Sequence, residues 1–160
     1  MFRIVIADAD ELSTLRLVAA LSSVPGLDVV GTATDGASAL EVVRDTLPDV
    51  VLLDMAVPPL GGLALLSAIR LAVPSSRVLV IVGAAREATV ERATSAGAAG
   101  FLVRETPTER TPTGLRLLVP ENDGPSAPYV ARLVSERRHL RPRRVRCTPA
   151  RRRTTHPRTR

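Results

Sequence analysis

The chain has 160 residues, 45% of them hydrophobic, which is enough for one well-packed core but not for two full domains. No apolar run is long enough to cross a bilayer, and no signal-peptide pattern precedes the first apolar run, so we expect a cytoplasmic protein. The single Cys147 excludes an internal disulfide framework and a zinc site built on cysteines.

Charge divides the chain into two parts. Residues 1–107 hold 8 Arg and 12 acidic residues, whereas residues 108–160 hold 14 Arg and 4 acidic residues. The second part is also rich in Pro and Thr. We therefore predict a globular domain over 1–107 and a Pro/Arg-rich tail over 108–160.

Short apolar runs of β-forming residues recur along the first part of the chain. Helical patterns separate these runs, and such alternation is typical of a parallel sheet with helices on both faces. We therefore expect an α/β fold with a doubly wound, five-stranded parallel sheet. The strands are predicted at residues 2–7, 27–32, 50–53, 78–82 and 100–103.

Four helices are expected between these strands. The first carries an apolar stripe that contains Leu12, Leu15, Ala19 and the neighbouring Val18 and Leu21. Asp35 is expected to cap the start of the second helix, because its carboxylate can accept hydrogen bonds from free backbone amides. Gly97 is expected as the left-handed residue that ends the fourth helix.

Polar side chains gather where the predicted strands end. Asp8 and Asp10 follow the first strand and predict an acidic pocket, Asp54 closes the third strand, and Arg104 follows the fifth. The carboxyl ends of parallel strands meet at one edge of the sheet, where binding crevices lie. A carboxylate at the end of a buried strand is therefore a candidate functional residue, although a turn or helix cap is the alternative for Asp54.

Three segments of the chain resemble the receiver domains of bacterial response regulators, in the branch that usually carries a LuxR/NarL-type DNA-binding domain. They read VVGTATDGASAL, PDVVLLDMAVPPLGGLALL and ERATSAGAAGFLVRE, and the resemblance covers about residues 2–107. It implies a flavodoxin-like (βα)5 fold in which a histidine kinase passes a phosphoryl group to Asp54 to control transcription. Such a transfer to a carboxylate requires Mg²⁺ and a further cation to neutralise the phosphoryl oxygens.

Three positions that support the acceptor in this family differ here. The family's pair of acids after the first strand falls on Asp8 and Ala9, so Mg²⁺ is expected at Asp8 and Asp54 but bound weakly. The family's switch hydroxyl falls on Val82, which cannot hydrogen-bond a phosphoryl oxygen. The family's lysine falls on Arg104, which keeps the charge in a planar fork. We therefore expect an atypical or impaired switch, and not an enzyme.

Two other interpretations remain open. One is a pseudo-receiver that works as an interaction module without phosphorylation. The other is a phosphatase, since Asp8 and Asp10 resemble the Asp-x-Asp motif of haloacid-dehalogenase-like enzymes, although these also need a lysine and this chain has none. Asp10 is not expected to replace the missing metal ligand, because successive residues of an extended chain point to opposite sides.

The basic tail has no recognisable helix-turn-helix pattern. Tyr129, Val130 and Leu133 predict a helix over 127–140, whereas residues 137–160 hold 11 Arg and few apolar residues, a profile typical of disorder. This Arg-rich segment is either a solvated extension without a function or an arm that binds nucleic acid non-specifically through phosphates. By resemblance, the other expected partners are a histidine kinase and a second copy of the chain, docked on the face between the fourth helix and the fifth strand.

Overall fold

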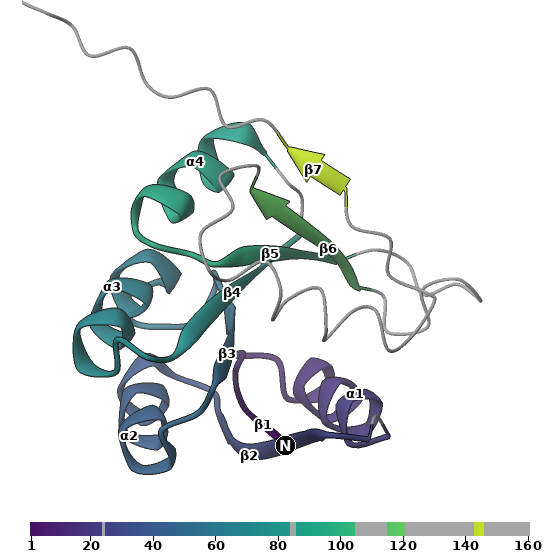
Figure 1. The fold of residues 1–160 in the computed structure, drawn as a ribbon. Coiled ribbons are helices and arrows are strands. Elements are labelled where there is room, and N and C mark those ends of the chain that lie inside the picture. Colours follow the sequence, from purple (N-terminus) through teal and green to yellow (C-terminus); the bar gives the residue numbers. More distant parts are fainter. Residues whose placement is uncertain (24, 84–85, 105–114, 121–142, 146–160) are drawn as a thin grey trace, which may run out of the picture.

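The computed structural model describes residues 1–23, 25–83, 86–104, 115–120 and 143–145. None of the helices in these ranges is long and apolar enough to cross a membrane. Figure 1 shows the elements in space. In chain order they are β1 (Phe2–Ala7), α1 (Glu11–Ser22), β2 (Leu27–Ala33), α2 (Gly36–Thr46), β3 (Val50–Asp54), α3 (Gly62–Ala72), β4 (Arg77–Val82), α4 (Glu87–Ser95), β5 (Gly100–Arg104), β6 (Leu115–Pro120) and β7 (Arg143–Val145).

The strands form one sheet in the order β2-β1-β3-β4-β5-β6-β7. The first five are parallel, which confirms the predicted doubly wound α/β fold. The chain moves outward from β1 in one direction to β2 and in the other through β3, β4 and β5, so the strand order reverses at β1. In sheets of this kind a crevice opens at the reversal point, beside the carboxyl ends of the strands.

The sheet is wider than predicted, because β6 and β7 lie in the segment expected to be an irregular tail. β6 runs antiparallel to β5, with Arg104 opposite Leu115 and Phe101 opposite Leu118, and β7 runs parallel to β6. Sequence reasoning missed β6 because three of its six residues are leucine, the strand ends at Pro120, and further prolines and glycines flank it. The helix predicted over 127–140 and most of the Arg-rich segment lie outside the described residues.

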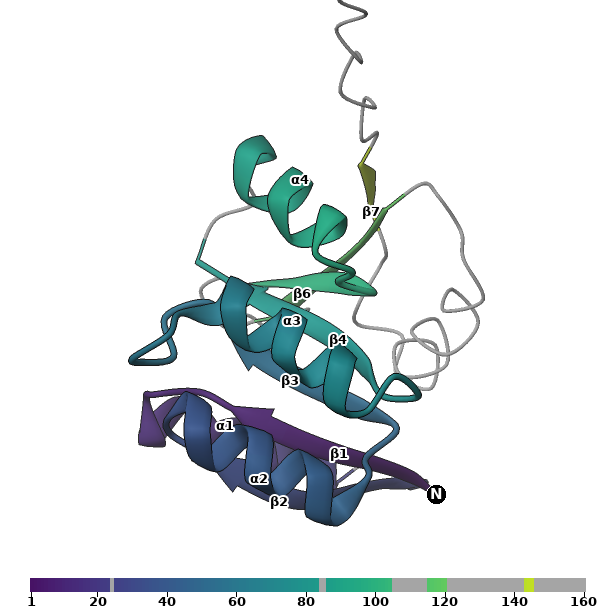
Figure 2. The same cartoon turned by 90° about the vertical axis from the view of Figure 1, so that its left-hand side faces the viewer.

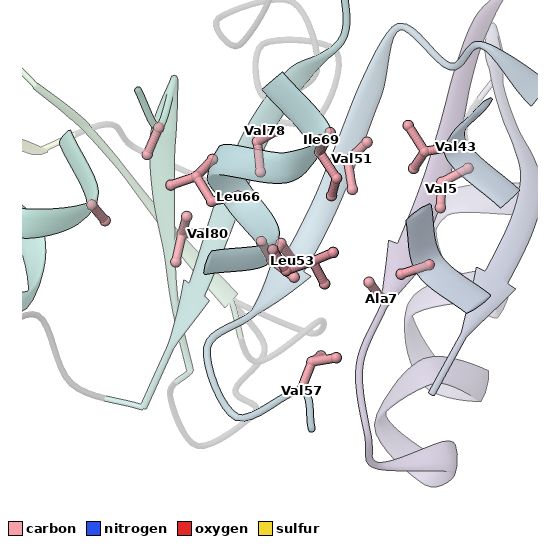
Figure 3. Close-up of a cluster of buried hydrophobic side chains, with 14 of the residues drawn as sticks. Val5, Ala7, Val43, Val51, Leu53, Val57, Leu66, Ile69, Val78 and Val80 are labelled. Carbon is pink, nitrogen blue, oxygen red and sulfur yellow. The ribbon is translucent and has the colours of Figure 1, made fainter. Parts of the chain in front are cut away.

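Alternate residues of each strand point to opposite faces of the sheet and build two apolar layers. One layer lies under α2, α3 and α4 and contains Val5, Val51 and Val80 (Figure 3). The other layer lies on the side of α1 and contains Ile6, Leu52 and Leu17. Figure 1 shows α2, α3 and α4 on one side of the sheet and α1 on the other, and Figure 2 looks onto the side of α2, α3 and α4. The strands are thus fixed in register by burial on both faces, which holds their polar ends in place.

The buried face of α1 differs from the predicted stripe. Leu12 and Leu15 are 56% and 66% exposed, whereas Thr14 and Leu17 are buried. Apolar residues occur on both sides of this helix, so periodicity alone permits either side to face the sheet. The prediction is wrong for Leu12 and Leu15, which lie on the surface, whereas Val18 and Leu21 of the same predicted stripe pack against the core.

Two predicted helix boundaries are confirmed. Asp35 caps α2, and its Oδ1 accepts hydrogen bonds from the backbone amides of Ala37 and Ser38 at 2.9 and 3.0 Å. Gly97 follows α4 with φ of +95°, a conformation that favours glycine. A Cβ at Gly97 would lie 2.6 Å from Nε of Arg70, so the close approach of this side chain also requires glycine.

Candidate functional site

Three residues from distant parts of the chain meet at the carboxyl edge of the sheet. Nη2 of Arg104 donates a hydrogen bond to Oδ2 of Asp8 at 2.6 Å and another to Oδ2 of Asp54. Nη1 of the same side chain donates to Oγ of Ser13, on the first turn of α1, at 2.5 Å. A single guanidinium group therefore connects the ends of β1, β3 and β5 with the start of α1.

Asp8 follows β1 directly and is almost fully buried, with 1% of the residue exposed. Its backbone amide donates to the carbonyl of Ala33 at 3.0 Å, which continues the pairing of β1 with β2. Oδ1 of its carboxylate accepts a hydrogen bond from the amide of Asp10 at 2.9 Å. A buried carboxylate is costly unless its charge is paired, and the guanidinium of Arg104 provides that pairing.

Asp54 is the last residue of β3 and is only partly buried. Its Oδ1 accepts a hydrogen bond from the amide of Ala56 at 2.7 Å, which fixes the carboxylate over the turn that follows the strand. The start of α3 packs against this turn, and a Cβ at Gly62 would lie 2.6 Å from Cα of Met55. Glycine at position 62 therefore allows α3 to approach the backbone beside Asp54.

The electrostatics of the site favour a charged Arg104. Partial burial of the guanidinium acts to lower its pKa, but the hydrogen bonds and charges of Asp54 and Asp8 outweigh that effect. The pKa of Arg104 is therefore raised above its ordinary value. The side chain is one-third exposed, so solvent reaches the guanidinium from one side.

The side chain of Asp10 does not bind Arg104 together with the carboxylates of Asp8 and Asp54. Its Oδ1 accepts hydrogen bonds from the amides of Leu12 and Ser13 at 3.0 and 3.3 Å, so Asp10 is the N-cap of α1. Val82 lies at the end of β4, is buried, and is paired with Val103 of β5. The structure thus brings Asp8, Asp54 and Arg104 together, while Asp10 serves the helix.

Sequence reasoning missed Ser13. The only signal was a hydroxyl-bearing residue on the helix turn that follows an acidic strand end, and many helices begin in this way. Its role depends on the forked end of the Arg104 side chain, whose Nη1 binds Ser13 while Nη2 binds both carboxylates.

The carboxylates of Asp8 and Asp54 converge as two ligands of Mg²⁺ would, but the complete donor set does not fit the ion. Ala9 has no side-chain oxygen where a further carboxylate is expected, and the described residues contain no group of three acidic, histidine or cysteine side chains able to hold a metal. The carboxylate oxygens also already accept hydrogen bonds from Arg104, Asp10 and Ala56. Six-coordinate Mg²⁺ would have to displace some of these donors.

Comparison with known proteins identifies the family and the fold. The family model described as "Response regulator receiver domain" matches residues 4–113. The chain belongs to the response regulator receiver domain family. This result confirms the family suggested by the sequence, and the receiver fold agrees with the observed order of β1 to β5.

Two curated relatives are regulatory proteins. The probable transcriptional regulatory protein NarL of Mycobacterium tuberculosis is 41% identical over 103 residues, which make up 64% of this chain and 48% of that protein. The response regulator GacA of Pseudomonas aeruginosa is 31% identical over 104 residues, 65% of this chain and 49% of that protein. The chain therefore spans about half the length of the curated relatives it matches.

A solved structure of the signal receiver domain of NarL from Mycobacterium tuberculosis is also similar. It superimposes with a TM-score of 0.63 at 38% sequence identity, and the match covers 70% of this chain and 90% of that domain. The likeness thus extends through nearly the whole receiver domain of that protein. It places this receiver in the NarL-like branch.

Proposed function

We propose that this receiver belongs to a two-component response regulator and that Asp54 accepts a phosphoryl group from a histidine kinase, slowly, to control transcription. The observation that carries this proposal is the position of Asp54, a partly exposed carboxylate at the end of β3 beside a fixed cation. The regulatory names of NarL and GacA support the proposal. It implies action in the cytoplasm, where the histidine of such a kinase would present its phosphoryl group.

The chemistry requires an oxygen of Asp54 to attack phosphorus. A new O–P bond forms an acyl phosphate while the P–N bond to the donor histidine breaks and the nitrogen keeps the electron pair. Oδ2 of Asp54 is hydrogen-bonded to Arg104, and Oδ1 to the amide of Ala56, so one of these bonds must open before attack. Arg104 would then stabilise the negative oxygens of the transferring group. Release of the acceptor oxygen is one reason to expect a slow reaction.

Phosphorylation of the full chain by a small-molecule phosphodonor tests the proposal. With acetyl phosphate, in the presence and absence of Mg²⁺, we expect slow incorporation of one phosphoryl group that hydroxylamine removes. Asp54→Asn should abolish incorporation, whereas Asp49→Asn, at the opposite end of β3, should not. Wild-type protein that stays unmodified under all these conditions would contradict phosphoryl acceptance.

A second candidate is a pseudo-receiver that binds a partner without phosphorylation. The bridge from Arg104 to both Asp8 and Asp54 favours it, because the acceptor is already engaged inside the chain. A phosphatase has less support, because Asp10, its expected general acid, caps α1. Absence of phosphorylation combined with partner binding would favour the pseudo-receiver, and turnover of phosphate esters would favour the phosphatase.

The remaining partners are also proposals. A second copy of the chain would dock on the face formed by α4 and β5, and nucleic acid would bind residues 137–160. The boundary of the receiver at residue 107 stays a prediction.

A further inference from the structure

The hydrogen bonds of the acidic pocket form a closed set. Asp8 accepts from the amide of Asp10 through Oδ1 and from Arg104 through Oδ2. Asp54 accepts from the amide of Ala56 through Oδ1 and from Arg104 through Oδ2. All four carboxylate oxygens thus have a donor from within the chain, and the one donor that both residues share is a cation.

We infer that Arg104, anchored by Ser13, is the resident cation of this pocket and stands in place of a divalent metal ion. Two carboxylates that converge on one atom repel each other unless a positive charge lies between them. Nη2 of Arg104 lies at that point, in contact with both Oδ2 atoms. The guanidinium therefore keeps the ends of β1 and β3 together when no metal is bound.

Ser13 acts as a positioning residue for this cation. An arginine side chain has several rotatable bonds and loses conformational entropy when it is held in one place. The 2.5 Å hydrogen bond from Nη1 to Oγ of Ser13 gives the guanidinium a third point of attachment, on an element other than β1 and β3. Asp10 caps the same helix turn through the amide of Ser13, so the cap of α1 and the anchor of Arg104 are adjacent.

The loss of a carboxylate at Ala9 and the presence of arginine at position 104 have the same consequence for the pocket. Without a carboxylate at position 9, the pocket carries two negative charges instead of three. One guanidinium satisfies both at once, because its planar fork presents several N–H groups in fixed directions. A compact ammonium group at position 104 would have to reach Asp8, Asp54 and Ser13 with a single nitrogen.

Magnesium titration of the full chain tests this inference without any phosphorylation. The melting temperature of the wild-type protein is expected to be the same in EDTA and in millimolar Mg²⁺, and the amide signals of residues 8–10 and 54–56 are expected to stay in place. Arg104→Gln should melt at a lower temperature in EDTA and recover in Mg²⁺, because the freed carboxylates can then bind the ion. Its apparent Kd for Mg²⁺ should be tighter than that of the wild type by at least about tenfold.

Three further variants separate this role from a general effect of charge or packing. Arg16→Gln removes an arginine from the exposed surface of α1 and should show no response to Mg²⁺. Ser13→Ala should respond in the same direction as Arg104→Gln but more weakly, and Ser13→Thr, which keeps the hydroxyl, should behave like the wild type.

Two outcomes would overturn the inference. One is a wild-type protein whose melting temperature rises in millimolar Mg²⁺ relative to EDTA, and this result stands even where Arg104→Gln fails to fold. The other is a folded Arg104→Gln protein without any metal response. Because the titration requires no phosphodonor, its result is independent of whether Asp54 accepts a phosphoryl group.

Discussion

Asp8 and Arg104 are separated by 96 residues in the chain, and a 2.6 Å ion pair joins their side chains at the carboxyl edge of the sheet. Asp8 is almost fully buried, so most of its surroundings cannot solvate a charge. The ion pair therefore serves the fold as well as the chemistry of the site. Substitutions of residues near this ion pair should change metal binding, the response to phosphorylation and the stability of the fold to different extents.

Restoring a carboxylate at position 9 should increase both metal binding and phosphorylation. Ala9→Asp adds an oxygen ligand beside Asp8, which favours Mg²⁺ in competition with Arg104. We expect a tighter Kd for Mg²⁺ by calorimetry and faster incorporation from acetyl phosphate. Ala9→Asn, similar in shape but neutral, is the matched control. Equal Mg²⁺ affinity in the wild-type and Ala9→Asp proteins would show that the missing carboxylate at position 9 does not weaken Mg²⁺ binding.

The surface around α4 should respond weakly to modification of Asp54. A switch requires an element whose two states the phosphoryl group stabilises differently, and Val82 offers no hydroxyl to such a group. A beryllofluoride mimic should leave the amide chemical shifts of Glu87–Ser95 nearly unchanged in the wild type and move them in Val82→Thr. Large shifts of α4 in the wild-type protein would refute this prediction.

Val82→Thr should also destabilise the fold, and Val80→Thr is the control for this effect. Val82 is buried, so an unpaired hydroxyl there should lower the free energy of unfolding by about 1–3 kcal/mol. Val80→Thr places the same group elsewhere on β4, under α3, and should cost a similar amount without sensitising α4.

Removal of the cap of α1 should destabilise the protein. In Asp10→Ala the amides of Leu12 and Ser13 lose their acceptor, and the free energy of unfolding should fall by about 1 kcal/mol. Urea denaturation measures this change. Asp10→Ser should retain most of the stability, and Asp28→Ala, an exposed acid on β2, should stay within about 0.5 kcal/mol of the wild type. An equally large decrease in the free energy of unfolding of Asp28→Ala would show that loss of the cap does not explain the effect of Asp10→Ala.

Acid should weaken the cap of α2 in a defined direction. The hydroxyl of Ser38, at 2.5 Å from Oδ2, and the amide of Ser38 lower the pKa of Asp35 below its ordinary value of 3.8. The folded state therefore binds this proton less readily than the unfolded state. The resulting stabilisation is present above pH 3.8 and is lost as the pH falls through the lowered pKa. Urea denaturation across this range should show a shallower pH dependence for Asp35→Asn, and an unchanged dependence would contradict the assignment.

The Arg-rich segment should bind DNA without reading its sequence. Neutralised phosphates release counterions, so the logarithm of the binding constant should fall with the logarithm of salt concentration by about 0.9 per contact. Replacing Arg151, Arg152 and Arg153 by Gln should reduce that slope, whereas Gln at Arg16, Arg44 and Arg86 of the receiver should not. Fluorescence anisotropy with promoter and scrambled duplexes measures both. A sequence preference that persists at high salt would indicate an ordered reading element instead.

The strands were predictable because each is marked by a short apolar run within its own sequence. Short runs such as VVLLD and RVLVIV are buried on both faces, and β1 to β5 begin and end within one or two residues of the predicted bounds. The phase of α1 was not predictable, since Leu12 and Leu17 lie on different sides of a helix that is apolar on both. β6 was missed for the opposite reason, because its pairing with β5 outweighs the weak local preference of its leucines.

The site was predictable in its members but not in its connections. Asp8, Asp54 and Arg104 were identified because strand ends in a parallel sheet meet at one edge. The sequence cannot indicate that one nitrogen of Arg104 is shared by both carboxylates while the other reaches Ser13. That arrangement depends on rotamers and on distances across β4, which only the packed structure determines.

The distance in sequence between Asp8 and Arg104 also orders events during synthesis. At about 5–20 residues per second, the ribosome makes Arg104 roughly 5–20 s after Asp8. Throughout that delay the nascent chain lacks the guanidinium, and water remains the main partner of the carboxylate at the end of β1. The ion pair that neutralises the buried carboxylate of Asp8 can therefore form only after β5 has been made, so the acidic edge of the sheet is completed late in synthesis.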